Sequence, residues 1–298
     1  MKAQEQQYLD LLQEALDEGD PRMDRTGVGT RSLFARSMTF DLSGGHVPLF
    51  TTKKVAWRTA IRELLWFLSG ETNIRPLVLQ GVHIWTDWPL ASFRRSHPGM
   101  SISRDQFEDW IKDDPSFAAK YADLGPTYGS QWRHWRGNGA VYDQISTLVK
   151  TLRTNPTSRR MLFTAWNVAD LEMMALPPCH VLYQYHVQQG RKLNCAVYQR
   201  SADLVLGLPF NVFEAAVLQY MLAQQTGLTP GRLTWFGGDV HLYENHVNVA
   251  IEQLLRRPRP VPILSFTRCP ESLFDYTLED FRLLGYEPYP ALHAPVAV

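Results

Sequence analysis

The chain has 298 residues, of which 45% are hydrophobic and 20% charged, as in an ordinary globular protein. Lys plus Arg equals Asp plus Glu at 30 each, so no positive field favours DNA binding or a mainly RNA-binding role. The N-terminus lacks the apolar core of a secretory signal, no apolar run is long enough to span a membrane, and three irregularly spaced cysteines make no disulfide framework. We therefore expect a cytoplasmic protein without membrane association.

Hydrophobic periodicity and turn-forming residues predict helices and strands along the whole chain. Helices are expected over about residues 8–18, 55–68, 105–110, 143–152, 212–225 and 244–255. Strands are expected over about 38–42, 161–166 and 232–236, with two more between 180 and 203. Helices and strands do not alternate regularly, which favours a mixed α+β fold in a single domain over residues 1–298. Residues 90–123, of mixed charge, are interpreted as an insertion.

The chain is organised around residues 176–211, which combine several reactive side chains in a short stretch. They include Cys179, Arg200, Ser201, Asp203 and Asn211. A cysteine thiolate is a strong nucleophile, and a neighbouring guanidinium favours the thiolate form. Arginine, serine and asparagine are groups that bind a phosphate and the edge of a flat heterocycle. An arbitrary cysteine is more often a buried structural thiol, so composition alone does not establish a site.

Glu63 lies in the most apolar part of the predicted helix at 55–68, just before Leu64 and Leu65. If it is buried there, desolvation favours the neutral acid and raises the pKa of its carboxyl. The alternative is a solvent-facing position on an amphipathic helix. The glycine-bearing loop at 24–30 has no Walker lysine, so a P-loop is not supported.

Several short motifs occur in one order along the chain. They are Asp24-Arg25-Thr26-Gly27, Glu63-Leu64-Leu65-Trp66-Phe67, Gly125 to Trp132, Ser158-Arg159-Arg160, Pro178-Cys179-His180, Gln199-Arg200-Ser201, Leu208-Pro209-Phe210-Asn211, Gly237-Gly238-Asp239, His241-Leu242-Tyr243 and the Ala-Pro-Val-Ala-Val end. This series resembles the thymidylate synthase family over nearly the whole chain. One such motif alone would be weak evidence for the family, whereas the full series in this order is very specific for it.

The resemblance implies a symmetric homodimer built on a large twisted mixed sheet flanked by helices, with the sheets packed back to back. It implies reductive methylation of dUMP by 5,10-methylenetetrahydrofolate, giving dTMP and dihydrofolate. The folate co-substrate supplies both the one-carbon unit and the hydride, so no metal and no nicotinamide cofactor is expected. The insertion at about 90–123 resembles that of longer bacterial members.

The resemblance also implies a role for individual side chains. Cys179 adds to uracil C6, and Glu63 and Tyr128 move protons through ordered water. Arg200, Asp203 and Asn211 complete the catalytic group. The residues expected to bind dUMP are Arg25, Gln199, Arg200, Ser201, Asp203, Asn211, His241 and Tyr243, with Arg159 and Arg160 reaching the site of the partner subunit. The folate is expected to contact Lys53, Ile84, Trp85, Trp88, Leu176, Asp203, Leu206, Gly207, Phe210 and Ala297.

Asn211 bears on the choice of base. Uracil presents an acceptor at O4 and a donor at N3, and a carboxamide offers the complementary pair. Cytosine reverses both groups, and the related deoxycytidylate hydroxymethylases resemble Asp at this position. Asn211 therefore favours a uracil substrate. It could also cap a helix beginning at Val212, and both roles are compatible.

The chain departs from the family pattern at three places: Thr86, Val55-Ala56-Trp57 and Phe213-Glu214. Val55-Ala56-Trp57 bears on contacts with the polyglutamate tail of the folate. Thr86 and Glu214 leave open a dUMP or, less favourably, dCMP hydroxymethylase on the same fold, in which water replaces hydride. Trp85 and the intact C-terminal tail favour hydride transfer, because both should exclude water. A more remote alternative is a non-catalytic nucleotide-binding or RNA-binding homologue, which the complete set of catalytic residues disfavours.

Overall fold

The computed structural model describes residues 4–296. Its contacts divide the chain into two compact units, each described here by itself. Unit 1 comprises Met1–Ile61, Leu148–Leu162 and Cys179–Val298, and unit 2 comprises Arg62–Thr147 and Phe163–Pro178. Within the described part of the chain, no helix combines the length and apolar character needed to cross a bilayer.

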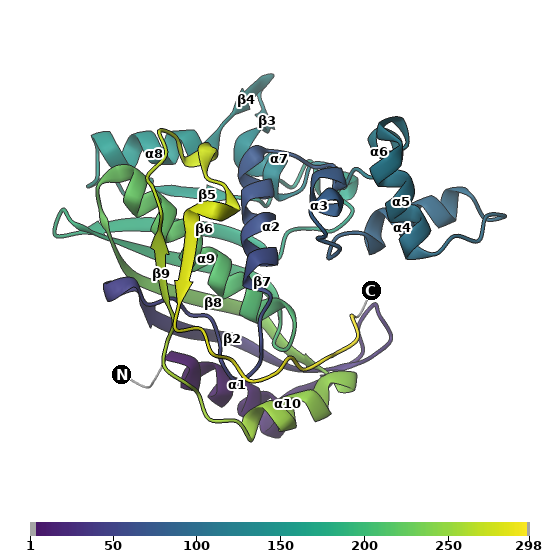
Figure 1. Cartoon of the computed structure of the whole chain (residues 1–298), viewed down its shortest axis with the longest axis horizontal. Coiled ribbons are helices and arrows are strands. Elements are labelled where there is room, and N and C mark those ends of the chain that lie inside the picture. The colour runs from purple at the N-terminus through teal and green to yellow at the C-terminus, as the bar shows by residue number, and fades with distance from the viewer. Residues whose placement is uncertain (1–3, 297–298) are drawn as a thin grey trace. The chain divides into compact units, whose positions relative to one another are not determined.

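The largest sheet has six strands and is mixed (Figure 1). Its order is β1 (Asp20–Arg22), β2 (Thr30–Asp41), β8 (Thr229–Tyr243), β7 (Lys192–Asp203), β6 (His180–Gln188) and β5 (Leu162–Thr164). β7 and β8 pair in parallel, whereas β1–β2, β2–β8 and β6–β7 pair antiparallel. The expectation of an α+β fold on a large mixed sheet flanked by helices is confirmed.

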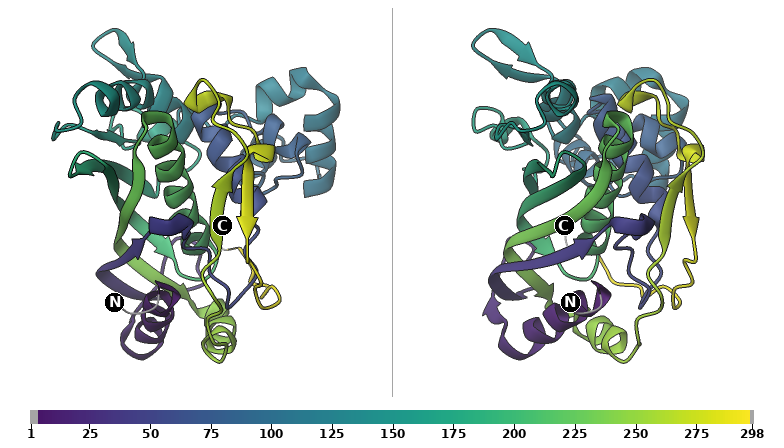
Figure 2. Two further views of the ribbon diagram at one scale, coloured as in Figure 1. Left: turned by 60° about the vertical axis from the view of Figure 1, so that its left-hand side comes forward. Right: turned by 90° about the vertical axis from the view of Figure 1, so that its left-hand side faces the viewer.

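The helix α9 (Gly207–Thr226) is the core of unit 1 and packs against β7 and β8 along one face of the sheet (Figure 2). Most of its residues are buried on every side, and even Gln219 is fully enclosed. The Gln219 amide donates to the Leu193 carbonyl of β7 at 2.7 Å, which satisfies a polar group that burial would otherwise penalise. Gly227 ends the helix in the left-handed conformation, with φ of 70°.

The remaining elements of unit 1 lie around this sheet. α1 (Gln4–Glu18) contacts β2 and also α10 (Val247–Leu254), and β9 (Ile263–Phe266) pairs antiparallel with β10 (Phe281–Leu284). Tyr8 of α1 stacks on Phe50 with ring centroids 4.2 Å apart, and its hydroxyl donates to the Leu204 carbonyl at 2.9 Å. The N-terminal helix is thus joined to the chain just after β7.

Unit 2 is mainly helical. It contains most of α2 (Trp57–Ser69), then α3 (Arg75–Leu79), α4 (Asp87–Ser96), α5 (Arg104–Asp113), α6 (Pro115–Tyr121), α7 (Tyr128–Arg133), the hairpin of β3 (Trp135–Gly137) and β4 (Ala140–Tyr142), and the start of α8 (Gln144–Thr154). Within the predicted insertion, Phe93, Phe107 and Phe117 form an aromatic core with ring centroids 5.5 to 5.6 Å apart. A capping box of Ser103 and Gln106 starts α5.

Several element bounds differ from the sequence prediction, and those of α9, β2 and β8 bear on the site. α9 begins at Gly207 and not at Val212, so Asn211 lies inside the helix and Leu206 is the N-cap. β2 and β8 extend well beyond the predicted strands. Gly237 and Gly238 therefore lie within β8 and do not end a strand. A Cβ on Gly238 would lie 2.9 Å from the Arg200 carbonyl oxygen, so close strand packing explains this glycine better than a turn does.

Candidate active site

The parallel pairing of β7 and β8 brings polar side chains to one end of the sheet. Ser201 lies opposite Asp239, and Asp203 lies opposite His241. On the other side of β8, Tyr243 lies opposite Thr30, where β2 begins. The loop that carries Arg25 immediately precedes β2, so it lies at the same end.

Cys179 lies at this end because it immediately precedes β6. The backbone N–H of Arg200 donates to the Cys179 carbonyl at 2.9 Å, which joins the start of β6 to β7. The Cys179 thiol is half-buried, and none of the three cysteines forms a disulfide. Burial raises the pKa of the Cys195 thiol to about 12, which makes it inert at neutral pH, and Cys269 is exposed. Cys179 thus differs in its environment from Cys195, which is buried, and from Cys269, which is exposed.

A chain of hydrogen bonds orients the carboxamide of Asn211. The Trp235 indole donates to Gln199 Oε1 at 2.9 Å, and Gln199 Nε2 donates to Asn211 Oδ1 at 2.8 Å. Asn211 also shares a hydrogen bond with His180, whose Nδ1 lies 3.1 Å from the Tyr183 hydroxyl. Burial lowers the pKa of His180 to about 4, so this imidazole is neutral at physiological pH. Sequence reasoning missed Trp235, because a buried strand tryptophan carries no functional signal.

His241 and Tyr243 lie two residues apart on β8, with ring centroids 5.1 Å apart. His241 Nδ1 is 3.0 Å from Asp239 Oδ1, and this hydrogen bond lowers the pKa of the Asp239 carboxyl. Burial raises the pKa of Tyr243 to about 12, with the charge of Asp203 adding to the shift. Tyr243 is therefore a hydroxyl donor at neutral pH.

The charges that act on Tyr243 indicate which groups surround it. The charge of Arg25 lowers the pKa of its hydroxyl, while Asp24 and Cys179 raise it. The arginine loop, the cysteine and the tyrosine therefore interact electrostatically within unit 1. Sequence prediction named all three, but their sequence positions are too far apart to show this interaction.

Asp203 is held at the end of β7 by backbone groups. Its Oδ1 accepts from the backbone N–H of Val205 at 2.8 Å and of Leu206 at 3.2 Å. Burial alone would raise the pKa of this carboxyl, but the hydrogen bond and charge of His246 help to lower it overall. His246 Nε2 in turn lies 2.7 Å from the Pro295 carbonyl. His246 was not predicted, and only its place three residues after Tyr243 could have pointed to it.

The predicted folate residues of unit 1 lie next to Asp203. Lys53 is only 5% exposed and donates to the Val205 carbonyl, and burial lowers the pKa of its amine to about 8. Leu206 and Phe210 are half-buried, and Gly207 begins α9 between Asp203 and Asn211. Ala297 lies outside the described residues.

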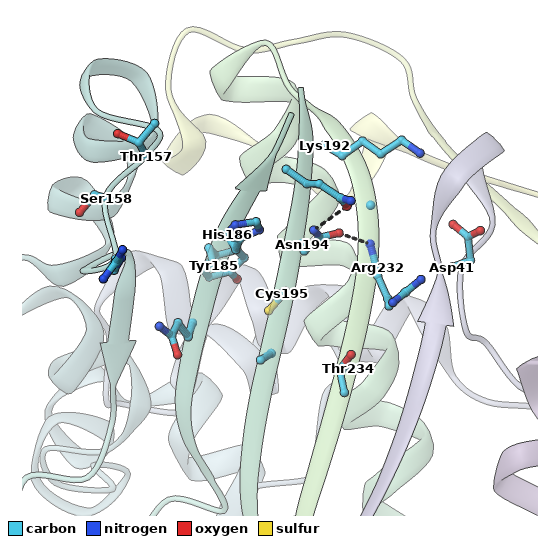
Figure 3. A pocket seen from close by; sticks show the side chains of 15 residues that line it. Asp41, Thr157, Ser158, Tyr185, His186, Lys192, Asn194, Cys195, Arg232 and Thr234 are labelled. Atoms are coloured by element: carbon cyan, nitrogen blue, oxygen red, sulfur yellow. Dashed lines mark hydrogen bonds between the residues drawn. The ribbon is translucent and has the colours of Figure 1, made fainter. Parts of the chain in front are cut away.

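Arg159 and Arg160 lie elsewhere on the sheet. Both side chains are exposed, and they immediately precede Met161, whose carbonyl accepts from Tyr185 N–H at 2.7 Å. Tyr185 is five residues along β6 from His180, roughly 17 Å at the usual strand rise. Arg159 lines a pocket over β6, β7 and β8, together with Tyr185 and Arg232 (Figure 3). The structure therefore does not bring these arginines to Cys179 of the same chain.

Unit 2 carries the predicted carboxylate and tryptophans. Glu63 is 6% exposed, and its Oε1 accepts from the Trp85 indole N–H at 2.5 Å. The Trp85 ring lies 5.2 Å from that of Trp88 and 6.2 Å from that of Tyr128. The solvent-facing alternative for Glu63 is wrong, because this face of α2 is covered by aromatic rings. Ile84 is partly exposed, and Leu176 is half-buried.

Across residues 4–296, no group of three or more His, Cys, Asp or Glu side chains is arranged to hold a metal ion. What unit 1 does bring together is a thiol, guanidinium groups, hydroxyls and an oriented carboxamide. Such a set can bind an anionic ligand and add a nucleophile to it. The fold and this set of groups define an α+β protein with the side chains needed for covalent catalysis.

Comparison with known proteins identifies the family. The chain matches thymidylate synthase over residues 6–298. The thymidylate synthase of Zymomonas mobilis subsp. mobilis is 59% identical over 295 residues, which are 99% of each chain. That of Rhodopseudomonas palustris is 56% identical over 299 residues, 100% of each, and that of Cereibacter sphaeroides 58% over 295 residues, 99% of each. The chain belongs to the thymidylate synthase family and is a methyltransferase.

Proposed function

We propose that this protein catalyses the reductive methylation of dUMP to dTMP, with 5,10-methylenetetrahydrofolate as donor and dihydrofolate as second product. The full-length match to thymidylate synthase over residues 6–298 carries the proposal. The cluster at the end of β7 and β8 supports it, because its groups complement a pyrimidine nucleotide. The proposed reaction uses no metal and no nicotinamide cofactor.

In this mechanism Cys179 Sγ adds to C6 of the uracil, which gives C5 the electron density to form a new C–C bond. Glu63 and Tyr128 then move protons through ordered water, including the proton that leaves C5. The burial of Glu63 among aromatic rings supports this role, since bulk water cannot compete there for its protons. The Cys179 thiolate leaves when the product is released.

Nucleotide binding is assigned to the polar groups around Cys179. Arg25, Arg200 and Ser201 bind the phosphate of dUMP, since guanidinium forks match its oxygens. Asn211 reads O4 and N3 of the base, supported by Gln199. His241 and Tyr243 bind the 3′-hydroxyl of the deoxyribose, and Tyr243 is a neutral donor because of its raised pKa.

The residues assigned to the folate fit a flat ring with a polar edge and an anionic tail. The apolar contacts with the ring are assigned to Ile84, Trp85, Trp88, Leu176, Leu206, Gly207 and Phe210. The Asp203 carboxyl has a lowered pKa and so accepts hydrogen bonds from ring N–H groups. Lys53 is assigned to the glutamate tail of the folate. When bound, the folate supplies the one-carbon unit and the hydride. Ala297 is also assigned to folate binding.

We further propose that units 1 and 2 form one catalytic domain, residues 1–298, in which 90–123 is a family-variable insertion. The active protein is a homodimer in the cytoplasm, with the sheets packed back to back. Paired residues Tyr198 and Phe236 support this arrangement, because their large side chains are exposed on neighbouring strands. Arg159 and Arg160 then reach the phosphate in the partner's site.

The test is an assay with dUMP and methylenetetrahydrofolate that follows dihydrofolate by absorbance and reads the product by mass. We expect dTMP and dihydrofolate in equal amounts, and turnover lost in Cys179→Ala but kept in Cys269→Ala, which removes an exposed thiol. Hydroxymethyl-dUMP formed without dihydrofolate would replace this proposal with the hydroxymethylase. Nucleotide binding without any product would favour the non-catalytic homologue.

A further inference from the structure

The predicted insertion contains a buried carboxylate that the proposed mechanism does not use. Glu108 of α5 is only 4% exposed. Its Oε1 accepts from the Thr86 hydroxyl at 2.5 Å, and its Oε2 lies 2.6 Å from His83 Nδ1. Arg104 Nε is 3.6 Å from Oε1, one turn earlier on the same helix. A carboxylate buried without partners would be strongly destabilising, so these contacts stabilise Glu108 at this position.

All three partners of Glu108 act on one short segment, residues 83–87. His83 and Thr86 belong to it, and Arg104 donates to the His83 carbonyl and lies 3.7 Å from Asp87 Oδ1. Trp85 lies between these anchors. The segment is thus held to α5 by side-chain and backbone contacts at both ends.

We propose that Glu108 is a positioning residue, which holds residues 83–87 so that the Trp85 indole stays hydrogen-bonded to Glu63. This inference rests on the proposed function, in which Glu63 moves protons. Trp85 Nε1 lies 2.5 Å from Glu63 Oε1, so a displaced segment would remove the donor that orients this carboxylate. The insertion then supports catalysis through a chain that runs from Glu108 through Thr86 and Trp85 to Glu63.

The same contact explains why residue 86 is a threonine here. A threonine hydroxyl can donate to the Glu108 carboxylate, whereas an ionised aspartate can only accept. An aspartate at residue 86 would face Glu108 at hydrogen-bond distance, and two adjacent carboxylates repel unless one binds a proton. Thr86 and Glu108 therefore form a matched pair.

The direct test measures the Trp85 indole without using activity. In protein labelled with 15N-tryptophan, the Trp85 N–H signal is assigned by its loss in Trp85→Phe. We expect Glu108→Ala to shift this signal and speed its hydrogen exchange roughly tenfold or more, since the anchor of the segment is gone. Asp109→Asn, which changes an exposed acid paired with Lys112 on the same helix, should leave it unchanged. An unmoved Trp85 signal in Glu108→Ala would overturn the proposal.

A compensation experiment tests the pair and its effect on catalysis. We expect Thr86→Asp to lower kcat for dTMP formation about tenfold or more. The Kd for dUMP should change less than about twofold. Thr86→Asp combined with Glu108→Gln should regain most of kcat, because a glutamine amide can donate to the aspartate. If the double variant is no better than Thr86→Asp, the pair is not what positions the segment.

These readouts separate the inference from the proposed function. If the intact protein makes no dTMP, the function fails while the Trp85 signal still decides whether Glu108 anchors the segment. Where Glu108→Ala is too unstable to label, Thr86→Val removes only the hydroxyl donor and keeps the side-chain shape. The Trp85 signal should then shift in Thr86→Val, and its constancy would contradict the proposal.

Discussion

At the scale of single residues, Asn211 shows how a buried network sets chemistry before any ligand binds. Gln199 donates to its Oδ1, and Gln199 is itself fixed by Trp235. These two hydrogen bonds disfavour a flip of the Asn211 carboxamide. The orientation of the Asn211 carboxamide is therefore decided by side chains from β7, β8 and α9 together.

We expect Asn211→Asp to lower kcat/KM for dUMP by roughly 100-fold or more, because the donor to O4 is lost. The carboxylate still accepts from Gln199, so the fold should persist, and dCMP should bind better than in the unmodified protein. Steady-state kinetics with both nucleotides check this. Asn155→Asp, a surface change after α8, is the control. Unchanged discrimination between dUMP and dCMP would show that Asn211 does not read the base.

Lys53 has a pKa near 8 in the folded protein, lowered by burial from the usual 10.5. The folded state therefore disfavours the ammonium, and at neutral pH it bears a cost of up to about 3 kcal/mol. That cost vanishes as pH rises from about 8 towards 10.5, because the amine then loses its proton in both states.

Lys53→Met should therefore be more stable than the unmodified protein at pH 7, and the advantage should shrink as pH rises. Urea unfolding at several pH values measures the difference in free energy of unfolding. Lys54→Met, at the exposed neighbouring lysine, should show no such trend. A difference between Lys53→Met and the unmodified protein that stays constant from pH 7 to pH 10.5 would mean that burial does not lower this pKa.

At the scale of elements, the alignment of β7 with β8 decides where the site groups lie. Gly238 permits this alignment, because a Cβ there would press on the Arg200 carbonyl at 2.9 Å. A backbone oxygen within a sheet cannot swing away as a flexible side chain can. The strands would have to separate at the residue that binds the phosphate in the proposed mechanism.

Gly238→Ala is thus expected to lower the free energy of unfolding by about 1–3 kcal/mol and to raise KM for dUMP. Urea unfolding and steady-state kinetics measure the two effects. Gly99→Ala is the matched control, since a Cβ there meets nothing within 4 Å. Wild-type stability and KM in Gly238→Ala would show that the sheet can absorb the methyl group.

At the scale of the whole molecule, the position of Arg159 and Arg160 argues for shared sites. They precede Met161, which hydrogen-bonds to Tyr185 far along β6 from His180 of the same chain, whereas the proposed function assigns them to the phosphate. Mixing Cys179→Ala with the double variant Arg159→Ala/Arg160→Ala should therefore restore activity. In a randomly reassociated dimer, half of the molecules are hybrids with one intact site, giving about a quarter of wild-type activity.

The control for this mixing experiment pairs Cys179→Ala with Glu63→Gln. Both residues are assigned to the same subunit, so no hybrid has an intact site and activity should stay absent. Mass spectrometry confirms that hybrids form. Hybrids of the arginine variant without activity, or a protein that sediments as a monomer, would reject the shared site.

The motifs and their order were enough to predict the fold class and the family, because the motifs are local and occur in a fixed order. They did not point to Trp235, His246 or Glu108. Element bounds were less well predicted. The predicted strand ended at residue 236, before Gly237 and Gly238, and the predicted helix began at 212, after Leu208-Pro209-Phe210. Propensity is local, whereas strand pairing and helix packing are not. Glu63 illustrates the same limit: only the rings around it show which face of α2 is covered.

The sequence by itself determined which chemical groups this protein has and the order in which they occur. The tertiary structure alone decided which of them meet: Trp235 with Gln199, His246 with Asp203, and Glu108 with Thr86. The physical reason is that hydrogen bonds and burial depend on distances in space, and residues 22 to 43 positions apart carry no mutual signal along one chain. Thr86, an unexplained departure in the sequence, thus became the partner of a buried carboxylate.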